Sequence, residues 1–297
     1  MRGIAACLVA TLLWASAFPA ITFSLREFTP YHLALLRYIF VTIAALIAIA
    51  VMRVKPPALK DLPRFFLLGL FGVAFYHITL YLGQQTIKAG TASLLVACTP
   101  ILTAIFAWKL LDEKFGARGW AGTGLAFVGA VLISFGQGER FGFSPGALWI
   151  LLTVLTTACY NVTQKGLLRR YSAREATLWP LVLGTLPLFA FTPGLMAEVR
   201  AATPITLWTV FYLGIGPGAI AYLTWAVGLK RAPASVVSSF LYLMPATAMT
   251  ISWFWLSEVP TPLTLIGGAL CLMGVALVNL RKRAKPTPAV PPAAPAG

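Results

Sequence analysis

The chain has 297 residues, of which 59% are hydrophobic and only 10% charged, and its mean hydropathy is +0.84. Ordinary soluble domains are about one quarter charged, so this composition excludes a soluble enzyme and predicts an all-α integral membrane protein. The net charge of +15 would suit a nucleic-acid partner, but the positions of Lys and Arg described below argue against one.

Apolar runs of roughly 20 residues, long enough to cross a bilayer as a helix, follow one another along the chain. They predict ten transmembrane helices, near residues 4–24, 32–52, 65–84, 90–110, 119–136, 145–165, 178–196, 207–228, 235–256 and 263–280. Gly and Pro, rather than polar loops, interrupt many of these runs. We therefore expect broken helices of the kind that line transporter cavities.

The first run begins like a secretory signal peptide, with Arg2 before an apolar stretch and Ala15-Ser16-Ala17 behind it. Because the run continues to about Leu25 and has a counterpart near residues 145–168, we expect it to be retained as a span. It carries three candidate substrate-binding residues, which are Trp14, Ser16 and Phe18.

The second run contains a cation, Arg37, a few residues inside one end. Three roles are open: its side chain reaches outward to the interface, pairs with Glu27, or binds a substrate carboxylate.

The third run carries a polar stripe, with His77, Tyr81, Gln84 and Lys88 spaced as on one face of a helix. Such polarity is costly in a bilayer unless it meets protein or water. We take Tyr76, His77, Tyr81 and Gln84 as candidate substrate-binding residues, and expect Lys88 to reach the interface.

The remaining runs contribute further candidates. Pro100 and Pro245 fall inside the fourth and ninth runs, where each is either a hinge or a static kink. Small residues share one face of the fifth run (Gly122, Ala126, Gly129) and of the tenth (Gly267, Cys271, Gly274), for packing within the chain or in a dimer. The candidate substrate-binding residues of the sixth, eighth and ninth runs are Asn161, Gln164, Tyr222, Trp225 and Tyr242. Together these side chains suit a zwitterion with an apolar side chain, although each could serve interhelical packing instead.

The chain also contains an internal duplication. Pro100, Glu113, Gly122 and Gly129 recur as Pro245, Glu258, Gly267 and Gly274, at one constant offset of 145 residues. Five spans in each copy is an odd number, so the second copy enters the membrane from the opposite side. We predict two inverted five-helix repeats, residues 1–143 and 144–283, followed by a disordered Pro/Ala tail, residues 284–297.

The basic residues predict the orientation. Most of the 23 Lys and Arg residues fall in segments on the side of the N-terminus, and the opposite side holds Arg26, Lys88, Arg140 and Arg200. Cytoplasmic segments are enriched in Lys and Arg, so both termini should be cytoplasmic.

The acidic residues all fall in loops or at the ends of runs, so no buried carboxylate is available as a proton relay. We favour facilitated diffusion, with proton exchange through His77 as the alternative. No phosphate-binding loop, metal-ligand spacing or cofactor motif is present in the sequence.

The duplicated pattern, the opening Leu13-Trp14-Ala15-Ser16-Ala17-Phe18 and Arg37 in the second span together resemble the EamA-type unit of the drug/metabolite transporter superfamily. The resemblance covers roughly residues 4–280 and implies ten spans with both termini inside, carrying a small solute. Within that superfamily the chain looks most like bacterial inner-membrane amino-acid exporters, including those for aromatic amino acids. As a multi-pass permease it would meet its solute and the lipid bilayer, without nucleic acid, as a monomer or homodimer.

Other substrates in the same fold are nucleotide-sugars, nucleosides and organic cations. The small cationic-drug exporters of the superfamily use a Glu in the first span, whereas residues 4–24 contain no acid. A membrane-embedded enzyme is disfavoured, because the chain has two His and no buried acid.

Overall fold

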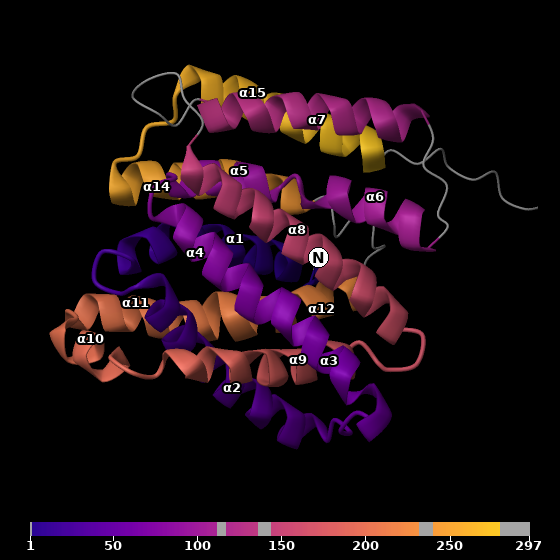
Figure 1. Cartoon of the computed structure of the whole chain (residues 1–297), viewed down its shortest axis with the longest axis vertical. Coiled ribbons are helices and arrows are strands. Elements are labelled where there is room, and N and C mark those ends of the chain that lie inside the picture. Colours follow the sequence, from indigo (N-terminus) through magenta and orange to yellow (C-terminus); the bar gives the residue numbers. More distant parts are fainter. Residues whose placement is uncertain (1, 112–116, 136–143, 232–239, 280–297) are drawn as a thin grey trace, which may run out of the picture.

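The computed structural model describes residues 2–111, 117–135, 144–231 and 240–279, and in these ranges the chain is helical without a strand (Figure 1). The first half contains α1 (Arg2–Ser24), α2 (Pro30–Met52), η1 (Leu59–Asp61), α3 (Leu62–Gly69), η2 (Leu70–Phe75), α4 (Tyr76–Gln84), α5 (Ala89–Val96), α6 (Thr99–Leu111) and α7 (Ala117–Phe135). The second half contains α8 (Pro145–Leu167), α9 (Glu175–Thr185), η3 (Leu186–Phe191), α10 (Leu195–Ala201), α11 (Pro204–Ile215), η4 (Gly216–Ile220), α12 (Ala221–Arg231), η5 (Phe240–Tyr242), α14 (Leu243–Leu256) and α15 (Pro262–Asn279).

Five helical stretches of the described residues are long and apolar enough to cross a membrane. They are Gly3–Ser24, Pro30–Met52, Leu59–Gln84, Pro145–Gln164 and Pro204–Trp225. A sixth is formed if Glu175–Phe191 and Leu195–Ala201, which are bent by 88°, make one span, and shorter apolar helices cover Ala89–Thr103, Ala117–Ile133 and Pro262–Gly274. The prediction of an all-helical, multi-pass membrane protein is confirmed.

Prolines mark the starts of several helices. Pro30, Pro145 and Pro204 each occupy the first position of a helix, where the missing N–H would have no intrahelical partner. At the start of α2, the Thr29 hydroxyl also accepts a hydrogen bond from the His32 amide. The helix ends at Arg53, whose φ of 51° turns the chain out of the helix.

The two prolines predicted to act inside spans instead lie near helix starts. Pro100 is the second residue of α6, after a break at residues 97–98 that separates α6 from α5. Pro245 is the third residue of α14, directly after the short turn η5. Neither therefore kinks the interior of a continuous helix, and the prediction of a mid-helix kink was wrong. Breaking the helix before the proline leaves its missing N–H without cost.

A wide π-helical turn interrupts the same span in each half. It covers Leu70–Phe75 between α3 and α4, and Gly216–Ile220 between α11 and α12. A π turn leaves part of the regular hydrogen-bond ladder unpaired, and such turns occur often at functional sites. Two residues beyond each turn stand His77 and Tyr222, which are candidate site residues.

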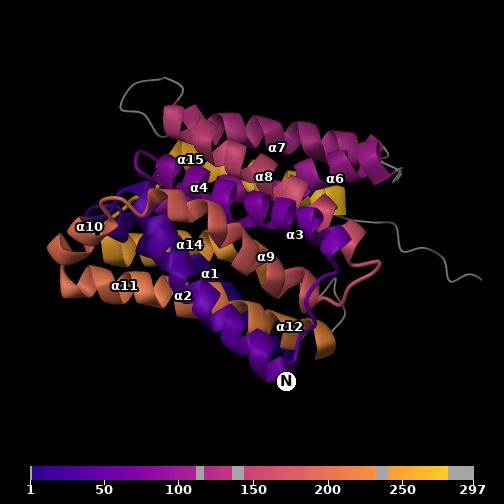
Figure 2. The same cartoon turned by 60° about the horizontal axis from the view of Figure 1, so that its bottom comes forward.

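Helices α7 and α15 pack side by side and lie together on one side of the molecule in both views (Figures 1 and 2). Their backbones meet closely: a Cβ on Gly129 would lie 2.5 Å from the Gly267 carbonyl oxygen, and one on Gly274 would lie 2.5 Å from that of Gly122. The small-residue faces therefore serve packing within the chain. The pairing is antiparallel, because the earlier residue of α7 meets the later residue of α15.

Each of the following contacts between the two halves has a counterpart in which the halves exchange roles. Helix α1 packs against α12 and α14, and α8, the first helix of the second half, packs against α4 and α6. Likewise α2 packs against α11, and α9 packs against α3. This reciprocal packing is what two similar units related by a two-fold axis would make.

Candidate functional site

Polar side chains of α2 and α4 meet in the interior of the helix bundle. The residues are Arg37 and Tyr38 of α2 and His77, Tyr81 and Gln84 of α4, and each is at most 6% exposed. We call this group the central cluster. Tyr76 adjoins it, since its ring centroid lies 4.6 Å from that of His77.

His77 holds the first turn of α4 against α2. Its Nδ1 lies 2.9 Å from the carbonyl oxygen of Val73 in the π turn, and its Nε2 lies 3.3 Å from the Tyr38 hydroxyl. A carbonyl can only accept, so Nδ1 must carry the proton. A neutral imidazole then accepts the Tyr38 O–H at Nε2, and both ring nitrogens are satisfied without a positive charge on the ring.

Arg37 is buried in this cluster and donates from Nη1 to the Tyr81 hydroxyl at 2.9 Å. Its guanidinium carbon lies 6.0 Å from the centre of the Tyr38 ring. Two of the roles left open by the sequence are excluded. Arg37 does not reach the surface, and Glu27 bonds instead to Thr203, whose amide donates to Oε2 at 2.7 Å.

Gln84 connects α4 to α1. Its Nε2 donates to the Phe18 carbonyl oxygen at 2.9 Å and to the Thr22 hydroxyl at 3.0 Å. The Phe18 carbonyl can only accept, which fixes the orientation of the amide. Its Oε1 is buried and has no hydrogen-bond partner among the described residues, so an unused acceptor lies one helical turn from Tyr81.

The aromatic candidates gather around the second π turn. Trp14 donates from Nε1 to the Pro217 carbonyl oxygen at 3.1 Å, and its ring centroid lies 5.4 Å from Tyr222 and 5.2 Å from Trp225. At each π turn, therefore, the N–H of a side-chain ring donates to a backbone carbonyl of the turn: His77 to Val73 and Trp14 to Pro217. The sequence-predicted residues thus form two groups, each beside one π turn.

Three other predicted site residues, Ser16, Asn161 and Gln164, bond to residues outside the central cluster. Ser16 bonds to the Tyr212 hydroxyl and the Leu13 carbonyl, and Asn161 donates to Thr103 at 3.1 Å. Gln164 donates to the Tyr160 hydroxyl and to the Ala176 carbonyl, between α8 and α9. The Tyr242 and Pro100 side chains, like Glu113, lie outside the part of the chain whose placement is described.

Comparisons with known proteins follow the same division of the chain into halves. The EamA-like transporter family model matches residues 1–135 and again residues 144–280. The chain belongs to this family.

Its relatives are named as transporters, and this EamA-like protein is a membrane transporter and not an enzyme. The "Uncharacterized transporter YdfC" of Bacillus subtilis is 38% identical over 91% of this chain and 88% of that protein. A "Probable terminal-alkyne amino-acid exporter" of Streptantibioticus cattleyicolor is 32% identical over 94% of each. One solved crystal structure shares the fold at a TM-score of 0.61 and 21% identity, covering 94% of this chain and 96% of that one.

In this EamA-like transporter, the acids of the described residues lie in connecting segments, at helix starts or in the short helix α10. They are Glu27, Asp61, Glu175, Glu198 and Glu258. Glu258, one of the residues of the duplicated pattern, accepts from the Ala89 amide at the start of α5 at 2.9 Å. Burial raises the pKa of its carboxyl group, and the hydrogen bond from Ala89 partly offsets that rise.

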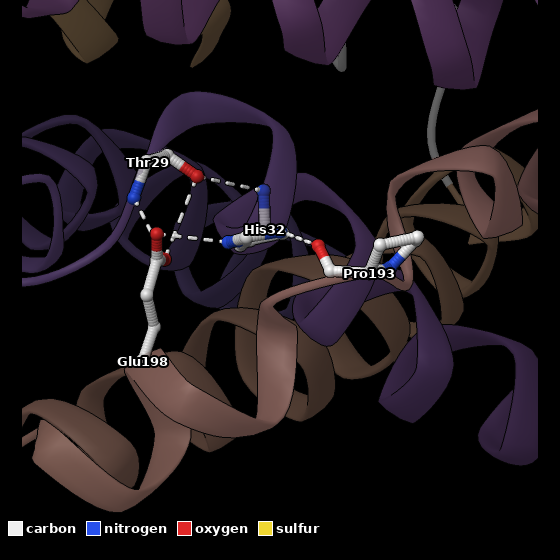
Figure 3. Close-up of polar contacts among 4 residues, drawn as sticks. All are labelled: Thr29, His32, Pro193 and Glu198. Atoms are coloured by element: carbon white, nitrogen blue, oxygen red, sulfur yellow. Dashed lines mark hydrogen bonds and ion pairs between the residues drawn. The ribbon is translucent and has the colours of Figure 1, made fainter.

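A second polar cluster lies at the end of the molecule that carries α10, at the left of Figure 1. Figure 3 shows His32 between Glu198, whose Oε1 is 2.8 Å from Nδ1, and the Pro193 carbonyl oxygen, 3.0 Å from Nε2. Glu198 also accepts from the Thr29 amide at 3.0 Å. This cluster ties the start of α2 to α10 and shares no residue with the central cluster.

Sequence reasoning missed Tyr38 and left the role of Arg37 open. In the sequence, Tyr38 is an aromatic residue in an apolar run, with nothing to distinguish it from the others. Only the packing of α2 against α4 brings it to His77. The one available signal was its position beside the buried Arg37.

Proposed function

We propose that this transporter is a secondary permease of the bacterial inner membrane that exports small amino acids or related metabolites by alternating access. The observation that carries the proposal is the central cluster, which buries a cation, an imidazole, phenols and an amide within apolar spans. Polar groups at such depth are costly, and they commonly mark a substrate path. The Gln84 Oε1 acceptor suits an ammonium group, and the rings near Trp14 suit an apolar side chain.

We further propose ten spans arranged as two inverted repeats, residues 1–143 and 144–283, with both termini cytoplasmic and a disordered tail over residues 284–297. Three observations support this topology: the two matches to the family model, the reciprocal packing of the halves, and the antiparallel contact of α7 with α15. The excess of Lys and Arg on one side supports the orientation.

Aromatic amino acids are included among the proposed substrates, since rings surround Trp14. Nucleotide-sugars fit less well, because a pyrophosphate calls for several cations, and among the residues whose burial the structure describes Arg37 is the one buried cation. The proposed substrate contacts include Trp14, Phe18, Tyr76, His77, Tyr81, Gln84, Tyr222 and Trp225. Ser16, Asn161, Gln164 and Tyr242 stay proposed substrate contacts as well. Pro100 and Pro245 stay proposed hinges.

The experiment is counterflow uptake in proteoliposomes preloaded with unlabelled aromatic, aliphatic, hydroxyl and charged amino acids. We expect saturable exchange, which the variants His77→Ala and Gln84→Ala abolish or reduce at least tenfold. Phe75→Ala is the matched control, because Phe75 precedes the same helix and its side chain is 44% exposed. Absence of exchange with every amino acid, from folded protein, would overturn the substrate class and leave nucleosides and cations to be tried.

A further inference from the structure

We propose that Arg37 and Tyr81 form the receptor for a substrate carboxylate, so that the transporter selects carboxylate-bearing solutes over their amides and amines. This inference rests on the proposed function, and it names the chemical group that the central cluster recognises.

Arg37 carries a buried charge. Arg37 is 6% exposed, and no carboxylate among the described residues pairs with it. The titratable groups that surround it are phenols and an imidazole: Tyr38 from its own helix, Tyr76, His77 and Tyr81 from α4, and Tyr222 from α12. A guanidinium stays charged in any protein environment, and a buried charge is costly unless an opposite charge accompanies it. The positive charge of the cluster is therefore not balanced by an anion among the described residues.

Arg37 and Tyr81 also keep unused hydrogen-bond donors. Arg37 Nε is buried and has no hydrogen-bond partner among the described residues. The Tyr81 hydroxyl accepts the Arg37 Nη1–H, so its own proton remains available for another acceptor. The Arg37 Nε–H and the Tyr81 O–H, on two side chains that are hydrogen-bonded to each other, are thus both available to an acceptor. A carboxylate has two oxygens, accepts from both, and matches the planar fork of a guanidinium.

The single cation of the cluster suits an anion with one negative charge. A phosphate monoester carries up to two charges and usually engages several cations, whereas this cluster offers one. A single carboxylate balances the charge of Arg37. The aromatic rings nearby then suit an apolar remainder of the solute.

The experiment compares matched ligands in competition for counterflow: phenylalanine and leucine, each with its amide, together with phenethylamine and 3-phenylpropionate. We expect the amides and the amine to compete about 10- to 100-fold less well than the amino acids, as the loss of a charged hydrogen-bonded pair implies. In Arg37→Gln the amino acids should lose this advantage over their amides. Tyr81→Phe keeps the ring and should lower amino-acid affinity about 3- to 10-fold.

The outcomes separate the two proposals. If wild-type protein exchanges amino acids and amides equally well, or if Arg37→Gln keeps the discrimination, the carboxylate receptor is wrong while amino-acid transport stands. If amino acids fail but 3-phenylpropionate is exchanged and Arg37→Gln abolishes it, the receptor stands and the amino-acid proposal fails. Exchange of no ligand overturns both. Should Arg37→Gln not fold, the wild-type ligand comparison and Tyr81→Phe decide the matter.

Discussion

Glu27 ties the loop after α1 to the start of α11. The Thr203 amide and hydroxyl donate to its carboxylate at 2.7 and 2.9 Å. The hydrogen bond from the Thr203 amide lowers the pKa of Glu27 below its ordinary value of 4.5. The native protein consequently binds fewer protons at this position than the unfolded chain when the pH is near 4.5.

The pH dependence follows from this depressed pKa. The stabilisation by Glu27 is fully present above about pH 4.5 and is lost as the pH falls through the folded-state pKa. We expect Glu27→Gln to lower the melting temperature by about 2–4 °C at pH 7 and to show a weaker fall in stability below pH 4.5. Thermal unfolding from pH 3 to 8 in a detergent stable over that range tests this. Parallel curves for variant and wild type would contradict it.

At the residue scale, the sequence could predict which side chains are costly in a membrane but not what they meet. The stripe of His77, Tyr81 and Gln84 was visible because polar residues recurred on one helical face. The partners come from other helices, Arg37 and Tyr38 from α2 and Phe18 from α1. No local pattern reports which helices will be neighbours, so the charge imbalance at Arg37 became apparent only in the fold.

At the element scale, the helices were predictable where apolar runs were long, and breaks inside runs were not. The π turns at Leu70–Phe75 and Gly216–Ile220 have no unique sequence signature, although both contain Gly. Pro100 and Pro245 were visible, but a proline near a helix start and one in a helix interior look alike without neighbours. The distinction depends on whether the preceding turn can break, as it does at residues 97–98.

The close contact of α7 and α15 gives a prediction with an internal control. A Cβ at Gly129 would lie 2.5 Å from the Gly267 carbonyl oxygen and 2.6 Å from the Cys271 amide, both backbone atoms that cannot move aside cheaply. A Cβ at Gly124, on the same helix, would meet nothing within 4 Å. We expect Gly129→Leu to destabilise the protein by at least about 3 kcal/mol, and Gly124→Leu to be neutral or stabilising.

Thermal unfolding with size-exclusion chromatography distinguishes the two variants. Gly129→Leu should lower the melting temperature and broaden the elution profile, and Gly124→Leu should do neither. If instead Gly129→Leu kept full monomer stability and only shifted a dimer equilibrium, the small-residue face would be a seam between chains.

At the scale of the whole molecule, the duplication links sequence to architecture. Contacts between α1 and α12 have their counterpart between α8 and α4, as expected if residues one offset apart hold equivalent positions. In the proposed inverted-repeat topology, a two-fold axis in the membrane plane would let the halves exchange conformations, which is the physical basis of alternating access. The recurring Pro, Glu and Gly residues predicted this symmetry. The distribution of Lys and Arg residues also predicted which loops face the cytoplasm, which the fold alone does not indicate.

That orientation is testable with two matched substitutions in the second half. Ala173 lies between α8 and α9 and Ala201 ends α10; both are exposed, and the proposed topology puts them on opposite sides of the membrane. We expect Ala201→Cys to react with a membrane-impermeant maleimide in intact cells, and Ala173→Cys to react only after permeabilisation. The native cysteines Cys7, Cys98 and Cys271 are buried, and Cys159 is replaced by Ala in the background. Because the proposed seventh span, which contains α9 and α10, separates the two positions, labelling of both from outside would contradict the topology, and labelling of Ala173→Cys alone would reverse its orientation.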